Sequence, residues 1–300
     1  MSFEILVMQV FGGLSLFTIL LLMAIGLAIV FGLMGVINMA HGELMAMGAY
    51  TTYLVSLLFQ QFLPSLMSIY LFFAILCAFG VTFIFGYLLE RNFIRFFYDR
   101  PLDTLLATWG LSLILQQLYR SVFGAQEVSV PTPSWLMGAW EPLQGIHLSL
   151  NRIFIIGLTI VVAIGVYILL YRTSWGLKVR AVTQNRPMSG ATGINTKRVD
   201  SLTFALGSGL AGIAGSVFTM IGSTNPGTGQ LYIVDTFIVV VFGSVQSLIG
   251  TVFSAFTIAQ SQTTLEYFLS GSIAKVLILL VVVVVLYFRP QGLFDKAIRR

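Results

Sequence analysis

Long apolar runs alternate with short polar connectors along almost the whole chain. A membrane-spanning helix needs about 20 mostly apolar residues. Such runs occupy residues 5–31, 44–60, 64–89, 102–123, 153–171, 199–222, 231–258 and 272–288. The pattern predicts an all-α, polytopic membrane protein, with residues 1–300 forming a single transmembrane domain.

The composition supports this class. Hydrophobic residues make up 57% of the chain, charged residues only 9%, and the mean hydropathy is +0.95. These values lie far outside those of soluble globular domains. The net charge of +5 resides in short connectors, where lipid headgroups and topology explain it, so nucleic acid is not an expected partner. The single cysteine, Cys77, falls within an apolar run, and we expect it to be a buried packing residue.

The positions of Lys and Arg predict the orientation. These residues concentrate in segments 91–100, 172–198 and 289–300. Basic segments stay on the cytoplasmic side, so we expect a multi-pass inner (plasma) membrane protein whose C-terminus is cytoplasmic. Connector 124–150 lacks Lys and Arg and is placed outside. It separates a first half, about 1–123, from a second half, 151–300.

The orientation requires one of the apolar runs to be broken. From connector 172–198 to the basic tail the chain must cross an even number of times, yet hydropathy gives three runs. The stretch IVVVFGSVQSLIG (238–250) is interrupted by Gly243, Ser244, Gln246 and Gly250, which suits a turn within the membrane. We therefore predict that 231–267 is a hairpin of short helices, giving about eight to ten transmembrane or re-entrant helices.

A comparable polar break occurs in the first half, in AIVFGLMGVINMAHG (28–42). Both breaks follow a Val-Phe-Gly sequence, which suggests an internal structural repeat. In transporters such repeats usually bracket the substrate path.

Polar residues near the two breaks are the candidate path residues. Asn38, His41 and Glu43 lie within six residues of one another, and ionisable groups at membrane depth usually mark a pathway. From the second half we add Asn225, Asp235 and Gln246. The alternative is that segment 35–50 is a solvated surface loop. With two histidines in separate connectors, no metal site is expected.

Connector 172–198, RTSWGLKVRAVTQNRPMSGATGINTKR, is long and polar, and it is punctuated by Pro187, Gly190 and Gly193. It is typical of a docking element for a cytoplasmic partner, although its charges alone satisfy the positive-inside rule. The chain contains no His-Glu-x-x-His, Gly-x-Ser-x-Gly or P-loop motif. We therefore expect a protein that is not an enzyme and holds no cofactor, and ATP-driven transport would need a separate ATPase.

Several segments carry a resemblance to a known family. GLMGVINMAHGELMAMGAY, RAVTQNRPMSGATGIN and the RPQGLF near the C-terminus resemble the permease subunits of the branched-chain amino-acid family of ABC importers. RPLDTLLATWGLSLILQQLYR (100–120) is similar to the branch that imports urea. The resemblance implies three kinds of partner: a second related permease, two ATP-binding subunits that use the ATP, and an extracytoplasmic substrate-binding protein. Membrane lipid is expected as a partner from the hydropathy.

The resemblance also implies that connector 172–198 contains the helix that seats in the ATPase. Gly193, Ile194 and Asn195 match the glycine-containing end of that element. The candidate coupling residues are Arg180, Gln184, Asn185, Gly193, Ile194 and Asn195.

The expected function is inward movement of urea, or a similar small polar solute, by alternating access. Asn38 can donate and accept hydrogen bonds, Glu43 can accept, and neutral His41 can do one of each. The alternatives are a branched-chain amino-acid permease, a secondary transporter or urea channel, and a purely structural membrane subunit.

Overall fold

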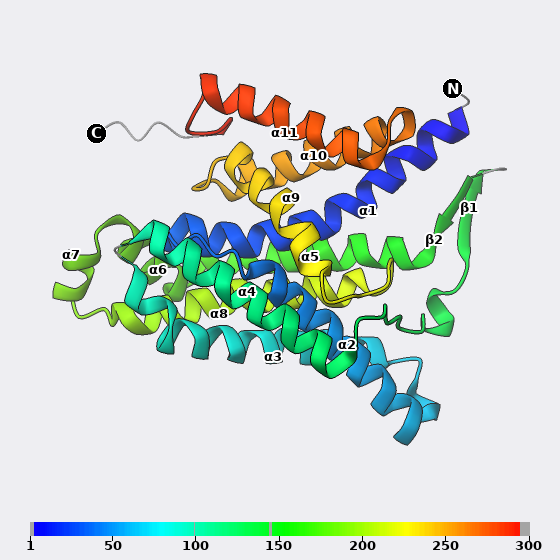
Figure 1. The fold of residues 1–300 in the computed structure, drawn as a ribbon, viewed down its shortest axis with the longest axis horizontal. Coiled ribbons are helices and arrows are strands. Elements are labelled where there is room, and N and C mark those ends of the chain that lie inside the picture. Colours follow the sequence, from blue (N-terminus) through cyan, green and yellow to red (C-terminus); the bar gives the residue numbers. More distant parts are fainter. Residues whose placement is uncertain (1–2, 99, 144–145, 295–300) are drawn as a thin grey trace.

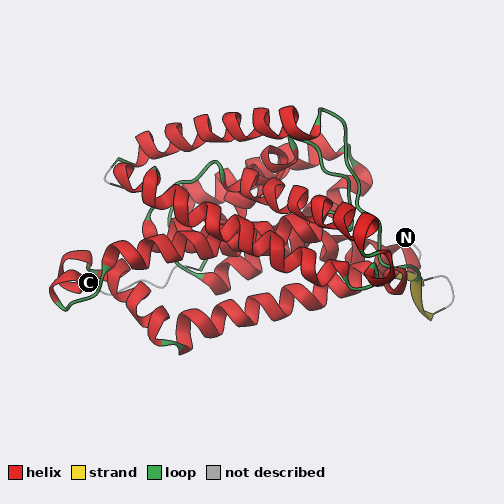
Figure 2. Ribbon diagram, turned by 90° about the horizontal axis from the view of Figure 1, so that it is seen from below, coloured by secondary structure: helices red, strands yellow, loops and turns green. Residues whose placement is uncertain are grey.

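The computed structural model describes residues 3–98, 100–143 and 146–294, and this part of the chain is almost entirely helical (Figures 1 and 2). The helices are α1 Phe3–Ala28, α2 His41–Phe62, α3 Tyr70–Asn92, α4 Pro101–Phe123, α5 Leu150–Arg172, α6 Ser174–Gln184, α7 Arg186–Ala191, α8 Thr196–Phe218, α9 Thr228–Gly243, α10 Leu248–Phe268 and α11 Gly271–Phe288. A π-helix, Ile29–Leu33, continues α1, and two antiparallel strands, β1 Ala139–Leu143 and β2 Ile146–Ser149, form a short ribbon. Nine of the described helices have 16 residues or more, within the predicted eight to ten.

Length and hydropathy agree with a membrane location. Five described helical segments are long and apolar enough to span a bilayer: Glu4–Leu33, Tyr70–Asn92, Leu150–Arg172, Thr196–Phe218 and Gly271–Phe288. The remaining long helices are either more polar or, in α9, shorter. The chain is an all-α polytopic membrane protein.

The elongated bundle has two chemically different ends (Figure 1). Helices α6 and α7 lie at one end, which we call the basic end. The β1–β2 ribbon and the start of α1 lie at the other, which we call the connector end. Backbone hydrogen bonds in both directions between Val128 and Thr224, each 2.9 Å, join connector 124–150 to the α8–α9 link there. The basic connectors and connector 124–150 thus lie at opposite ends, as their charges predict.

Helix α8 forms the centre of the bundle, whereas α11 lies at its edge. The most apolar window of α8 is 89% buried, while that of α11 is 11% buried. Helix α8 contains the string ALGSGLAGIAGS, and small residues allow neighbouring backbones to approach closely in lipid. It packs against α1, α2 and α3. Of the five candidate spans, α8 is therefore both the least hydrophobic and the most buried. The lipid-facing helices carry the larger apolar side chains.

The predicted break within 231–267 is confirmed. Helices α9 and α10 are separated at residues 244–247 and pack antiparallel, with the Ser254 hydroxyl donating to the Val239 carbonyl at 2.7 Å. Ser244 has a φ of 82°, and Ser247 caps α10 by accepting from the Gly250 N–H at 3.0 Å. From α8 onward there are four long helices, the even number that the charge pattern requires.

The structure supports an internal repeat in a different register from the one that the Val-Phe-Gly sequences suggest. Two pairs of helix contacts correspond. Helix α3 packs along α8, and α10 packs along α1 in the same way. Helix α2 packs on α8, and α9 likewise packs on α1. This pattern relates α1, α2 and α3 to α8, α9 and α10. Helices α1 and α8 run in opposite directions between the two ends, so the repeat is inverted. The first-half break at 35–40 therefore corresponds to the α8–α9 link. The expected correspondence between that break and the break at residues 243–250 is wrong.

Two short sequences share this register. NMAHGEL (38–44) opens α2, and NPGTGQL (225–231) opens α9. The Asn38 side-chain oxygen accepts from the Ala40 N–H at 3.1 Å, and the Asn225 oxygen accepts from the Gly227 N–H at 2.9 Å. Each asparagine thus forms the same side-chain turn shortly before its helix, a local geometry that asparagine favours.

Thiol labelling tests the two ends. In a Cys77→Ala background, a cysteine at Ser134 should react with an impermeant maleimide added outside intact cells, whereas one at Asn185 should react only after the cells are opened. Both positions are exposed and lie at opposite ends. Cys77 must be replaced because it lies exposed on α3, so the expectation of a buried packing cysteine is wrong.

Reversed labelling would overturn the assignment of the basic end to the cytoplasm. Labelling of both positions from outside would contradict the two-ended topology itself.

Candidate functional site

The first break is enclosed by protein rather than lying at the surface. Asn38, His41 and Glu43 are 2%, 0% and 1% exposed. After the π-helix the chain leaves helical geometry, with Gly35 at a φ of 71°, and α2 begins only at His41. Irregular backbone inside a membrane protein persists only where protein or water satisfies it. This burial contradicts the alternative of a solvated loop.

Helix α4 lines the break with polar side chains spaced four residues apart. Thr108 accepts from the Met39 N–H at 3.1 Å. Ser112 and Gln116 both donate to the same Glu43 oxygen, at 3.1 and 2.9 Å. Sequence analysis missed this stripe, although the four-residue spacing of Thr108, Ser112 and Gln116 was the available signal. A helix completes one turn in 3.6 residues, so these side chains share one face.

Several polar atoms at the start of α2 have no hydrogen-bond partner within the described part of the chain. They are the Asn38 amide nitrogen, His41 Nδ1 and the second Glu43 oxygen, Oε2. His41 Nε2 lies 3.2 Å from the Met23 carbonyl, which can only accept, so Nε2 carries a proton and Nδ1 is available. Buried polar groups are normally paired, so this cluster can receive a polar ligand or water.

The starts of α2 and α9 meet through their backbones. A Cβ on Gly42 would lie 2.2 Å from the Gly229 carbonyl oxygen, and a Cβ on Gly229 would lie 2.3 Å from the Gly42 oxygen. No side chain fits at either position. The N-terminal ends of α2 and α9 therefore cross at one point.

Of the three second-half candidates, only Asn225 lies near the start of α9, whereas Asp235 and Gln246 lie further along the chain. Asn225 opens α9 from the connector end, where its amide donates to Glu127 at 3.3 Å. Hydrogen bonds from Ser223 and Asn225 hold the pKa of Glu127 below its ordinary value. Asp235 forms an ion pair with Lys275 of α11, with Nζ 2.6 Å from Oδ2.

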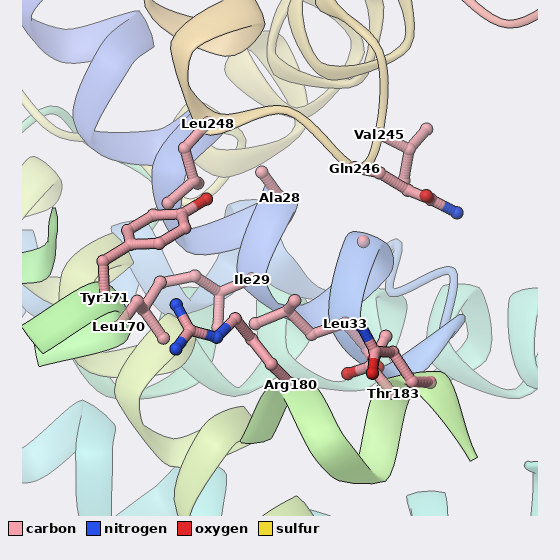
Figure 3. A pocket seen from close by; sticks show the side chains of 12 residues that line it. Ala28, Ile29, Leu33, Leu170, Tyr171, Arg180, Thr183, Val245, Gln246 and Leu248 are labelled. Carbon is pink, nitrogen blue, oxygen red and sulfur yellow. The ribbon is translucent and has the colours of Figure 1, made fainter. Parts of the chain in front are cut away.

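Gln246 lies at the basic end, on the wall of a cavity of about 190 Å³ (Figure 3). The π-helix, the end of α5, α6 and the α9–α10 link all contribute to this cavity. Arg180 and Gln184, both candidate coupling residues, also line this cavity.

The other candidate coupling residues shape connector 172–198. Asn185 caps α7 by accepting from the Met188 N–H at 3.0 Å, and Asn195 caps α8 by accepting from the Arg198 N–H at 3.0 Å. Gly193 follows α7 with a φ of 86°, and the Ile194 N–H donates back to the Ser189 carbonyl at 3.1 Å. This is a left-handed helix stop that favours glycine. Pro187 sits in the first turn of α7, where proline is tolerated, so it starts a helix rather than breaking one.

A buried polar network ties this connector to the bundle. Glu90 is fully buried at the end of α3 and accepts from Arg95 Nη2 at 3.1 Å, from Tyr98 at 2.5 Å and from Ser201 of α8. Arg186 of α7 pairs with Asp200 of α8, and its guanidinium lies 5.3 Å from the centre of the Tyr98 ring. The start of α7 is thereby anchored to both α3 and α8. Sequence analysis missed Glu90 and Asp200. Each is a lone acidic residue beside a basic segment, and that position was the available signal.

Comparison with known proteins decides the family. The model of the branched-chain amino acid transport system / permease component family matches residues 9–286. The chain belongs to this permease family. It is 28% identical over 293 residues to the high-affinity branched-chain amino acid transport system permease protein BraD of Pseudomonas aeruginosa, covering 96% of this chain and 95% of BraD. It is 25% identical over 293 residues, with the same coverage, to the LivH permease proteins of Salmonella typhimurium and Escherichia coli. No solved structure matches the chain.

The family resemblance drawn from the sequence motifs is confirmed by this match. The narrower resemblance to the urea branch is not supported, because BraD and the two LivH proteins are all named as branched-chain amino acid permease proteins.

The helix stop at Gly193 generates a prediction about this permease. Gly193→Val should leave membrane insertion intact but reduce substrate-stimulated ATPase activity of the reconstituted transporter severalfold, because a β-branched residue is strained at positive φ. Gly190→Val is the matched control: Gly190 lies in α7, has no positive φ, and has no atom within 4 Å of a Cβ built on it.

Equal stimulation in the two variants would show that the geometry of this stop does not contribute to coupling.

Proposed function

We propose that this chain is the transmembrane permease subunit of an ATP-driven importer that moves branched-chain amino acids inward by alternating access. The family match over residues 9–286 and the names of the full-length relatives support the substrate class. Urea is less well supported as the substrate, because BraD and the LivH proteins are named as branched-chain amino acid permease proteins.

The observation that carries the proposal is the crossing of α2 and α9 beside unpaired polar groups. Gly42 and Gly229 bring the starts of α2 and α9 into contact. Helix N-termini carry partial positive charge and free N–H groups, which favour a carboxylate. A zwitterionic amino acid also needs an anionic partner for its ammonium group, and Glu43 has one oxygen without a partner among the described residues.

The surroundings of this crossing suit an aliphatic side chain. Leu44, Met45 and Ile233 are buried close to it. Asn38 and His41 supply additional donors and acceptors. We assign Asn38, His41 and Glu43 to substrate contact, and Asn225 and Gln246 to the two approaches, from the connector end and the basic end. Asp235 acts indirectly, by holding α9 to α11 through Lys275.

The two ends suit different partners. The basic end presents α6 and α7, anchored through Arg186 and Asp200, as a platform for two ATP-binding subunits. The connector end, with its β1–β2 ribbon, would receive an extracytoplasmic substrate-binding protein. A second related permease would complete the transporter in the inner membrane, with the C-terminus of this chain in the cytoplasm. A secondary transporter would not need such a platform.

Removing the charge of Glu43 tests the substrate class. In the assembled transporter, Glu43→Gln should reduce leucine uptake about tenfold or more, because a charge-assisted hydrogen bond contributes roughly 1.5–3 kcal/mol. Uptake of radiolabelled leucine and urea should be measured in proteoliposomes, with Glu4→Gln, an exposed carboxylate in the first turn of α1, as the matched control.

Parental leucine uptake by Glu43→Gln would remove Glu43 from the substrate site. Urea uptake without leucine uptake in the unmodified transporter would contradict the proposed substrate.

A further inference from the structure

Two neighbouring hollows lie beside α1 at the basic end; the deeper one is lined by α5 and α10 as well, and together we call them the cleft. Both outer helices pack on α1. At the basic end the cleft opens into the 190 Å³ cavity of Figure 3. A second hollow of about 70 Å³ follows, lined by Ile25, Ala163, Val166, Tyr167, Leu248, Ile249 and Val252. Leu248 belongs to both linings, so the two hollows adjoin.

The polarity of the cleft changes along its length. The cavity at the basic end has four polar side chains, Arg180, Thr183, Gln184 and Gln246, in an otherwise mostly apolar lining, whereas the deeper hollow is lined by aliphatic side chains and one tyrosine. A ligand that filled both would have a polar head at the basic end and a hydrocarbon part further in. This is the shape of a membrane lipid rather than of a small solute.

Arg180 provides an unmatched positive charge at the head of the cleft. Its guanidinium lies 5.2 Å from the centre of the Tyr171 ring. Within the part of the chain that the structure describes, Arg95 and Arg186 each pair with a carboxylate, whereas Arg180 has neither a carboxylate nor a hydrogen-bond partner. Figure 3 shows its guanidinium directed into the cavity, between Tyr171 and Ile29. Because an unpaired charge is costly near lipid, a half-buried arginine at the edge of a membrane-spanning bundle is expected to bind an anion.

We propose that this cleft binds an anionic phospholipid, with the phosphate on Arg180 and an acyl chain along Ile25, Val166 and Leu248. Tyr167 and Tyr171 are 48% and 42% exposed, so the cleft is open on its outer side, where lipid surrounds the helices. Their rings lie 4.9 Å apart and form an amphipathic edge of the kind found at membrane interfaces.

The bound lipid would lie beside two elements that both contact the π-helix. The Thr183 hydroxyl donates to the Leu33 carbonyl at 2.9 Å, which holds α6 against the π-helix. A Cβ on Gly32 would lie 2.1 Å from the Val245 carbonyl oxygen, so the α9–α10 link touches the same segment. A lipid headgroup on Arg180 would lie in the cavity that both elements line. This binding site is independent of which solute the permease transports.

Native mass spectrometry of the detergent-purified transporter, with its partner subunits present, tests the proposal. Phosphatidylglycerol should bind about fivefold more tightly than phosphatidylcholine, since a basic residue near the headgroups contributes about one kcal/mol. Arg180→Gln should abolish this preference, while Arg180→Lys should retain most of it. Lys178→Gln is the matched control, because Lys178 lies on the same helix but outside the cavity lining.

Equal binding of the two lipids, or a preference that survives Arg180→Gln, would overturn the proposal. Displacement of phosphatidylglycerol by millimolar leucine would assign the cavity to a transported solute instead. Absence of lipid, together with protection of a cysteine at Ala163 by the second permease, would make the cleft a subunit interface.

Discussion

The contact between the starts of α2 and α9 is the constraint on which the rest of this permease depends. Each helix begins inside the bundle, and the two begin where Gly42 and Gly229 lie backbone to backbone. Because neither position has room for a Cβ, the crossing cannot slide without breaking the packing of both helices against α8 and α1. A displacement of one of these helices must therefore be shared by the other.

The polar groups of the bundle are distributed around this crossing in a consistent way. Each of these two helices is held to a peripheral helix by a polar contact: α2 to α4 through a buried hydrogen bond between Glu43 and Ser112, and α9 to α11 through the partly buried ion pair of Asp235 and Lys275. The network centred on Glu90 then connects α3 and α8 to the start of α7. Since unpaired polar groups are expensive in lipid, these contacts fix which helices move together. These contacts connect α7 at the basic end to the helices that pack on the crossing.

Sequence alone predicted the features that follow from hydropathy and charge. The apolar runs, the two different ends and the break within 231–267 all follow from local composition, because lipid imposes length and polarity on each span. The positive φ at Gly193 also follows from its place at a helix stop. The burial of Asn38 and Glu43 does not, since the same residues are equally typical of a surface loop.

The remaining features depend on contacts between distant parts of the chain. Glu43 meets Ser112 across 69 positions, and Glu90 meets Ser201 across 111. The repeat register was misjudged because Val-Phe-Gly recurs by composition, whereas NMAHGEL and NPGTGQL share only three identical residues. The urea expectation rested on one motif in α4, whereas the family match covers residues 9–286 and lends urea no support.

The thermal unfolding midpoint of the purified transporter tests the crossing most directly, with Gly42→Ala compared against Gly80→Ala. Gly80 lies in α3 with no atom within 4 Å of a Cβ built on it, so it reports the effect of adding a methyl group without crowding. The account predicts a lower midpoint for Gly42→Ala, reflecting an overpacking cost of roughly 1–3 kcal/mol, and an unchanged or slightly higher midpoint for Gly80→Ala. Equal midpoints in the two variants would show that α2 and α9 do not meet backbone to backbone.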